Sequence, residues 1–179
     1  MDAVIRKATL DDRPVLADLI ARSARGLSRG DYTGEQIESA LGTGVFGVDS
    51  ALIVDGTYFV AEAGGGIVGC GGWSRRRTLF GGDRFAEREA EELDPRSEPA
   101  RIRAFFVDPK WSRRGIGKRI LERCESDARA HGFRSAELMA TLPGEKLYGA
   151  LGYGVVERAE YEMDDGVMIA LVRMRKLFE

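Results

Sequence analysis

The chain has 179 residues, of which 44% are hydrophobic and 31% are charged, which is ordinary for a soluble globular domain. Its 27 basic and 29 acidic residues nearly cancel, so the formal net charge of -2 gives no overall attraction to nucleic acid or anionic membranes. Two cysteines are too few for a disulfide framework, and neither a signal peptide nor a bilayer-spanning apolar run is present, so we expect a cytoplasmic protein.

We expect residues 1–179 to form a single domain that starts with a strand and two helices. Residues 4–8 are a strand candidate, and a helix follows Pro14, which the first helical turn tolerates. A second helix is predicted from Thr33, because Thr33 and Gln36 have the spacing of a capping box, and the glycine-rich residues 42–47 end it. Strands at 57–63 and 67–73 then form a hairpin through three glycines.

The second half of the chain begins with a polar, charged segment, residues 74–99. We expect this segment to be a surface excursion, partly helical over the glutamate-rich residues 87–92, and not a domain boundary. A strand is predicted at 101–107, followed by a helix at about 114–131 and a strand at 133–140. One apolar stripe is expected on this helix, formed by Ile116, Ile120, Leu121, Cys124 and Ala128. A short helix at 145–151 precedes a hairpin of residues 153–163 and 167–174. On the strand at 101–107 the predicted faces are Ile102, Ala104 and Phe106 opposite Arg103, Phe105 and Val107.

The order of these elements, β-α-α-β-β-β-α-β-α-β-β, predicts an α/β (α+β) fold. We expect a mixed, largely antiparallel central sheet flanked by helices. The strand, helix and strand between residues 101 and 140 imply a right-handed crossover and therefore one parallel pair of strands.

A basic loop that contains glycine leads from the strand at 101–107 into the long helix. The first amides of a helix have no intrahelical acceptor and the helix dipole adds positive charge there, so this junction favours an anion. Gly115 and Gly117 lack the Cβ atoms that keep a phosphate from the backbone. Arg113, Arg114 and Lys118 add charge. The loop therefore predicts a phosphate-binding site.

Other interpretations of this loop stay open on the residues alone. The two glycines can serve tight turning and close packing, and the basic residues can form a solvated face. Contact with nucleic acid is disfavoured by the balanced charge of the chain. The spacing of a nucleotide P-loop does not occur, and Gly115-Ile116-Gly117 lacks the third small residue of a dinucleotide fingerprint.

Three segments resemble the motifs of the GNAT (GCN5-related) N-acetyltransferase family. They are IRKAT at 5–9, FVDPKWSRRGIG at 106–117 and LYGALGY at 147–153, in the family's order. The chain departs from the family at Ser112, where Gln or Arg is frequent. The resemblance covers most of the chain except 74–99 and implies acetyl-CoA as co-substrate, with its pyrophosphate on the loop and its pantetheine along the strand end. The implied cofactor-binding residues are Phe106, Val107, Arg113, Arg114, Gly115, Ile116, Gly117 and Lys118.

The resemblance also implies direct transfer of the acetyl group to a primary amine of a small molecule or peptide. Tyr148 is then the general acid that protonates the leaving thiolate, whereas on the residues alone a tyrosine on a short amphipathic helix is more often a core residue. The amide of Val107 is the expected donor to the thioester oxygen. No general base is identified; Glu62 is a weak candidate and Glu35 a weaker one.

The remaining charged residues suggest less. His131, the single histidine, sits at a helix end, where contact with the dipole explains it, so we expect no metal site. Arg75, Arg76 and Arg77 are expected in a solvated loop, with the 3′-phosphate of CoA or an acidic acceptor as the alternative. A carboxylate-bearing acceptor becomes attractive only if Arg101 and Arg103 both face the acceptor cleft.

Two alternatives to the N-acetyltransferase remain at this point. The chain can be a non-catalytic acyl-CoA-binding sensor, which needs the loop but no working acid. It can also be an acyltransferase for a longer acyl group or an oxygen nucleophile, because recognition of pyrophosphate is blind to the acyl end. The family habit is consistent with a homodimer. The balanced charge and the lack of a spanning apolar run lead us to expect no nucleic acid and no membrane as partner.

Overall fold

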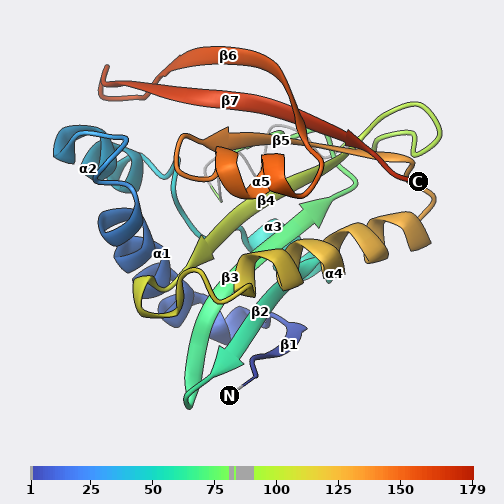
Figure 1. The fold of residues 1–179 in the computed structure, drawn as a ribbon, viewed down its shortest axis with the longest axis horizontal. Coiled ribbons are helices and arrows are strands. Elements are labelled where there is room, and N and C mark those ends of the chain that lie inside the picture. The colour runs from blue at the N-terminus through green and yellow to red at the C-terminus, as the bar shows by residue number, and fades with distance from the viewer. Residues whose placement is uncertain (1, 81–82, 84–90) are drawn as a thin grey trace.

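The computed structural model describes residues 2–80, 83 and 91–179. Within these residues, seven strands form one sheet in the order β1-β2-β3-β4-β5-β7-β6 (Figure 1). All neighbouring strands are antiparallel except β4 and β5, which confirms the predicted mixed, largely antiparallel sheet. The strands are β1 (Val4–Lys7), β2 (Tyr58–Ala63), β3 (Gly66–Ser74), β4 (Ala100–Val107), β5 (Ser135–Thr141), β6 (Gly154–Glu162) and β7 (Met168–Leu177).

Helices cover both faces of the sheet. One face carries α1 (Arg13–Leu27), α2 (Gly34–Gly42) and α3 (Ser50–Asp55), and the other carries α4 (Ile116–Ala130) and α5 (Glu145–Ala150). Figure 1 shows α4 running across the front of the sheet over β2 and β3. The helices predicted after Pro14, from Thr33, at about 114–131 and at 145–151 are present. Helix α3 was not predicted, because six residues are too few to show a helical period.

Local signals in the sequence explain where two helices begin. The predicted capping box at α2 is confirmed, since the Gln36 amide donates to Thr33 Oγ1 at 3.1 Å and the Thr33 amide donates to Gln36 Oε1 at 2.9 Å. At α3 the Asp49 carboxylate accepts from the Leu52 amide at 3.3 Å. The partly helical character predicted for residues 87–92 lies mostly outside the described residues.

Two apolar cores, one on each face, hold the helices against the sheet. The predicted apolar stripe of α4 is buried on its face, and burying each such aliphatic side chain contributes about 1.5–3 kcal/mol. The opposite core is formed mainly by α1, α2 and α3 against the same strands. The stripe of α4 consists of Ile116, Ile120, Leu121, Cys124 and Ala128.

The parallel strands β4 and β5 pair at one end only. Residues 100–102 of β4 pair with residues 136–138 of β5, and the strands separate beyond that point. The remaining part of β4, residues 103–107, therefore has an edge toward β5 that no strand fills. Seven strands thus make one sheet with an opening near its middle, and this opening positions the site described below.

A bulge at Ala104 shapes the free part of β4. Ala104 has a φ of 58°, in the left-handed region, and the register with β3 shifts between Cys70 and Gly72. The hydroxyl of Tyr58 donates to the Ala104 carbonyl at 3.0 Å, and the Cys70 thiol lies 3.7 Å from the same oxygen. These two side chains from neighbouring strands hold a backbone conformation that costs a non-glycine residue about 1–3 kcal/mol.

The bulge changes which side chains share a face, so the predicted alternation along β4 is wrong. Because of the extra residue, Ile102 shares the α4 face with Phe105 and Val107, which were predicted on the opposite face. The α4 face receives Ile102, Phe105 and Val107, whereas Ala104 and Phe106 pack in the core of the α1 face. An inserted residue shifts all later side chains of a strand to the opposite face, so alternation predicted across a bulge fails.

Candidate active site

A cavity of about 830 Å³ occupies the opening between β4 and β5. Its walls come from α1, the connection between α2 and α3, the segment after β3, the free part of β4, the loop before α4 with the start of that helix, β5, α5 and β7. It contacts side chains of both apolar cores. Of the predicted site residues, the cavity brings together Phe106, Val107, Arg113, Gly115, Ile116, Gly117, Lys118 and Tyr148, but not Arg114.

The N-terminus of α4 opens onto this cavity. The first intrahelical hydrogen bond runs from the Arg119 amide to the Gly115 carbonyl at 3.0 Å, so the amides of residues 116–118 have no intrahelical acceptor. Because the helix is 15 residues long, its aligned peptide dipoles add positive potential at this end. The amide groups and the dipole together suit an anion.

The two glycines of the loop have different roles. Gly115 has a φ of 79° and precedes the first residue of α4, and a Cβ atom there would meet open space, so the backbone angle is what requires glycine. At Gly117 a Cβ atom would lie 3.0 Å from Leu147 Cδ2. The absence of a side chain at Gly117 therefore lets α4 pack against α5, which the sequence left as one of two explanations.

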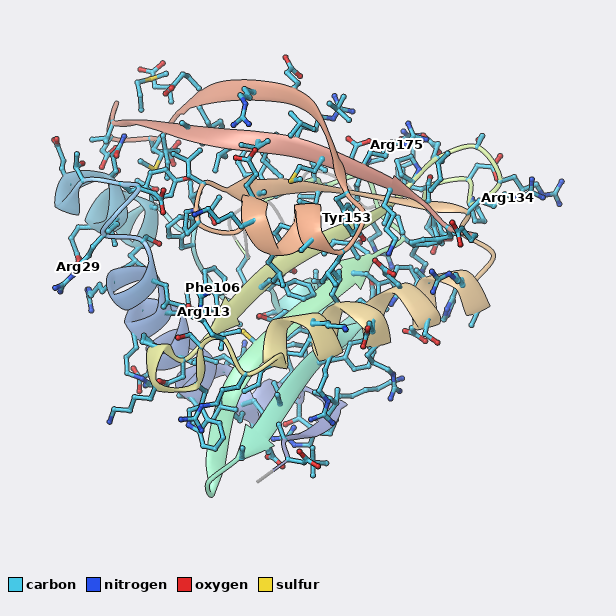
Figure 2. All side chains as sticks on the ribbon, viewed as in Figure 1. Arg29, Phe106, Arg113, Arg134, Tyr153 and Arg175 are labelled. Atoms are coloured by element: carbon cyan, nitrogen blue, oxygen red, sulfur yellow. The ribbon has the colours of Figure 1, made fainter. Side chains whose placement is uncertain are left out.

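The basic side chains of the loop are also distinct. Figure 2 shows Arg113 beside Phe106, at the end of β4 and the start of α4, and both residues line the cavity. The guanidinium of Arg114 lies over the Trp111 ring, 4.9 Å from its centroid, and outside the cavity. Lys118 lines the cavity and has Glu122 3.8 Å away. Arg113 and Lys118 are thus the cationic side chains that the loop offers to the cavity.

The amide of Val107, predicted to hydrogen-bond a thioester oxygen, donates to Ser23 Oγ at 3.2 Å. Ser23 belongs to α1, is 4% exposed and lines the cavity. Sequence reasoning missed it, although a serine in register with the buried Leu16, Leu19 and Ile20 is a visible signal. Helix α1 lies so close to the loop that a Cβ atom on Gly26 would be 2.4 Å from Pro109 Cγ, so this approach requires glycine.

Tyr148 presents a hydroxyl without a partner in the described part of the chain. The residue is 8% exposed, lines the cavity and makes edge-to-face ring contacts with Phe105 and Tyr153. No described residue hydrogen-bonds its hydroxyl, and burial raises the pKa of Tyr148 above its usual value. The phenol is therefore protonated near neutral pH, which is the form a general acid needs.

Tyr153, in the same sequence motif, has its hydroxyl occupied. It donates to Glu125 Oε1 at 3.0 Å, and the same carboxylate accepts from Lys176 Nζ at 3.0 Å. Both Glu125 and Tyr153 are buried, so this contact belongs to the core under α4. The structure thereby separates the two tyrosines, one facing the cavity and one bound in a polar cluster.

Neither candidate base lies at the cavity. Glu62 pairs with Arg6 at 2.8 Å on the β1–β2 side of the sheet, and Glu35 is exposed in the first turn of α2. Among the described residues that line the cavity there is no carboxylate and no imidazole. His131 lies at the end of α4 with Nδ1 2.8 Å from the Asp127 carbonyl, as its position predicted.

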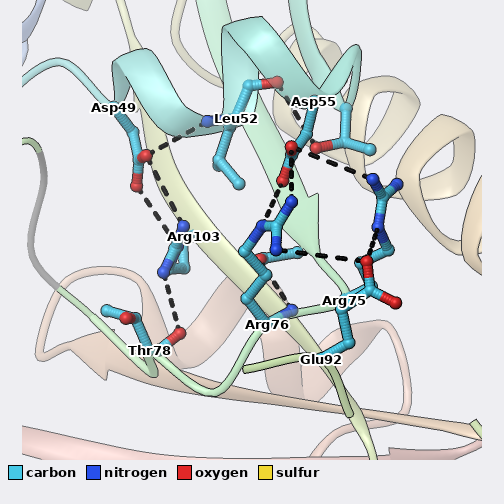
Figure 3. A network of polar contacts seen from close by, with 10 residues as sticks. Asp49, Leu52, Asp55, Arg75, Arg76, Thr78, Glu92 and Arg103 are labelled. Carbon is cyan, nitrogen blue, oxygen red and sulfur yellow. Dashed lines mark hydrogen bonds and ion pairs between the residues drawn. The ribbon is translucent and has the colours of Figure 1, made fainter. Parts of the chain in front are cut away.

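The arginine run 75–77 is engaged in ion pairs away from the cavity. Arg75 lies 3.1 Å from Glu92, Arg76 lies 2.9 Å from Asp55, and the first two residues of the run appear in Figure 3. Arg77 contacts Glu98 at 2.6 Å. These pairs tie the two described ends of the 74–99 segment to each other and to α3.

Arg101 and Arg103 do not both face the cavity. Arg101 lies 3.5 Å from Glu137 and does not line it. Arg103 does line it, but its Nε is 3.2 Å from Asp49 Oδ2 and its Nη1 donates to the Thr78 carbonyl at 2.9 Å (Figure 3). The condition for a carboxylate-bearing acceptor is therefore not met.

The described residues offer neither a metal site nor a membrane span. They contain no group of three or more His, Cys, Asp or Glu side chains arranged to hold a metal ion. Within the same residues, no helix combines the length and apolar character needed to cross a membrane.

The family model for the acetyltransferase (GNAT) domain matches residues 54–155, more than half of the chain. This chain belongs to the GNAT acetyltransferase family. The match spans the β4 bulge, the basic loop, α4 and Tyr148, so it confirms the resemblance seen in the sequence motifs. No curated protein sequence is significantly similar to this GNAT acetyltransferase.

Solved structures share the fold of this GNAT acetyltransferase at low sequence identity. A GCN5-related N-acetyltransferase from Rhodopseudomonas palustris is 20% identical, with a TM-score of 0.74 over 99% of this chain and 97% of that one. PaiA N-acetyltransferase from Thermoplasma acidophilum, in complex with coenzyme A, is 16% identical, with a TM-score of 0.66 over 99% and 100%. YncA, a putative acetyltransferase from Salmonella typhimurium with acetyl-CoA, is 16% identical, with a TM-score of 0.61 over 100% and 95%.

Proposed function

We propose that residues 1–179 act as one catalytic domain that transfers an acetyl group from acetyl-CoA to a primary amine. The observation that carries this proposal is the cavity between β4 and β5, which joins the N-terminus of α4 to the Tyr148 hydroxyl, to which no described residue hydrogen-bonds. Solved structures of the same fold, PaiA and YncA, hold coenzyme A and acetyl-CoA.

The residues present suit the parts of acetyl-CoA. The free amides at the start of α4, with Arg113 and Lys118, offer positive charge to a pyrophosphate. The open edge of β4 at residues 103–107 offers backbone groups to the amides of pantetheine, as a strand does to an added strand. The apolar side chains Phe105, Ile116 and Leu147 suit the chain between those polar groups.

In the proposed reaction the amine nitrogen attacks the thioester carbonyl, and the carbon–sulfur bond breaks. Tyr148 gives its proton to the departing thiolate and recovers one from solvent. The Val107 amide, at the free part of β4, donates to the developing oxyanion. Without substrate this amide donates to Ser23 Oγ. The ammonium proton leaves to water, because the described lining of the cavity supplies no carboxylate or imidazole to take it.

Calorimetry with acetyl-CoA, followed by thiol release in the presence of amines, tests the proposal. We expect acetyl-CoA and CoA to bind, and free thiol to appear only when an amine is added, with one acetylated amine formed per thiol. Binding without thiol release in any amine would favour the non-catalytic acyl-CoA sensor. No binding of acetyl-CoA or CoA would overturn the function itself.

A further inference from the structure

We propose that the acceptor carries its primary amine on an apolar body, such as an aromatic ring or a branched alkyl chain. This inference rests on the proposed function, because it names the substrate class of the same cavity. The observation behind it is the chemistry of the cavity end on the α1–α3 face of the sheet, opposite the face that carries α4 and α5.

That end of the cavity is walled by apolar side chains from four separate parts of the chain. Phe46 comes from the connection between α2 and α3, and Leu79 and Phe80 follow β3. Met139 comes from β5 and Leu171 from β7. We call these five residues the acceptor wall. An apolar group placed against such a wall loses its contact with water, which favours binding by about 25 cal/mol per Å².

Two aromatic rings of the acceptor wall are held in place by other rings. Phe46 meets Phe106 edge to face, with centroids 6.0 Å apart. Phe80 meets Tyr161 edge to face, with centroids 4.9 Å apart. Rings fixed by such contacts form a preformed surface, so little side-chain freedom is lost when an apolar ligand binds.

A buried ion pair fixes the two loops that supply these rings. Arg103, on β4, lies 3.2 Å from Asp49, which follows Phe46 in the chain, and donates to the carbonyl of Thr78, which precedes Phe80 (Figure 3). The side chains of Arg103 and Asp49 are only 5% and 3% exposed. Asp49 therefore balances the charge of Arg103, and the guanidinium links the segment that carries Phe46 to the segment that carries Phe80.

An acceptor with a second cationic group would find no negatively charged side chain in the described lining of the cavity. No carboxylate lines the cavity among the described residues, whereas an ammonium taken out of water without a partner is costly. Di- and polyamines are therefore poor acceptors at this end. A monoamine with an apolar body avoids this penalty, because its one nitrogen is the reacting group.

The same wall helps to deprotonate the acceptor. Alkyl amines have a pKa near 10, so at neutral pH about one molecule in a thousand is the nucleophilic free base. Transfer into an apolar site disfavours the charged form and lowers the pKa of the amine. The acceptor wall thus favours the reactive form at a site whose described lining holds no carboxylate or imidazole to accept the proton.

Acetyl transfer to a panel of amines, with saturating acetyl-CoA, tests this inference. The panel is phenethylamine and the linear series from propylamine to hexylamine, against agmatine, spermidine and ethanolamine. We expect kcat/KM to rise two- to fourfold with each added methylene and to be at least tenfold higher for phenethylamine than for agmatine. A flat alkyl series, or a preference for agmatine or spermidine, would overturn it.

The variant Phe80→Leu links the preference to the acceptor wall. We expect it to lower kcat/KM for phenethylamine at least fivefold and to leave acetyl-CoA binding unchanged. Val54→Ala is the matched control, since Val54 is 73% exposed and lies outside the cavity. Equal effects on phenethylamine and ethanolamine would count against the inference. If acetyl-CoA binds and only polar amines react, this inference fails while the proposed function stands.

Discussion

Tyr148 and Tyr153 share one sequence motif, and their rings are in contact, with centroids 6.0 Å apart. Their hydroxyls nevertheless differ in what they can do. The Tyr153 hydroxyl is bound to Glu125, whereas the Tyr148 hydroxyl faces the cavity without a partner among the described residues. The motif alone cannot tell which hydroxyl has a partner, because Glu125 and Lys176 come from other elements.

The substitution Tyr148→Phe separates chemistry from stability. We expect kcat to fall by about 100-fold or more, the usual scale of a lost general acid, while acetyl-CoA affinity and folding stability stay near those of the parent. Tyr153→Phe is the matched control. It removes a hydrogen bond to a buried carboxylate and should cost about 1.5 kcal/mol of unfolding free energy with little change in kcat. Equal kcat values for the two variants would remove Tyr148 from the mechanism.

At the scale of elements, local sequence signals carried most of the prediction. The capping box at Thr33, the apolar stripe of α4 and the glycines of the β2–β3 hairpin depend only on neighbours in the chain, and each is confirmed. The bulge at Ala104 was missed because side chains from β2 and β3 hold it. Alanine is not a residue type that signals the left-handed conformation, so the sequence around Ala104 does not predict the bulge.

The loop before α4 offers a test of element geometry through its glycine. Gly115→Ala should destabilise the fold by about 1–2 kcal/mol, because alanine is strained at a φ of 79°. It should also weaken acetyl-CoA binding, since the amides at the start of α4 shift with the backbone. Chemical denaturation and calorimetry measure the two effects.

The matched control for this glycine is Gly149→Ala in α5. A Cβ atom there meets nothing within 4 Å and no strained angle is present, so alanine should stabilise the fold by about 0.5 kcal/mol. A stable Gly115→Ala variant with parental affinity for acetyl-CoA would contradict the role given to this turn.

At the scale of the whole molecule, the site exists because two parallel strands part after three pairs of residues. The order of elements predicts that β4 and β5 are parallel neighbours, but it does not predict where they separate. Separation depends on the bulge in β4, on α5 packing over β5, and on α1 packing against the loop after β4. These long-range contacts create the cavity and bring Ser23 and the acceptor wall to it. They could not be predicted, because the periodicity within a single element says nothing about contacts between elements.

The Cys70 thiol that supports the bulge also gives a way to measure how often the sheet opens at that point. Cys70 is fully buried against the Ala104 carbonyl, and burial raises its pKa to about 12, so an alkylating reagent can react only when the sheet opens there. Saturating CoA should slow iodoacetamide labelling of Cys70 more than that of Cys124, under α4, as peptide mass spectrometry can follow. Equal slowing at both thiols would mean that the ligand stabilises the fold as a whole and leaves the bulge no special part.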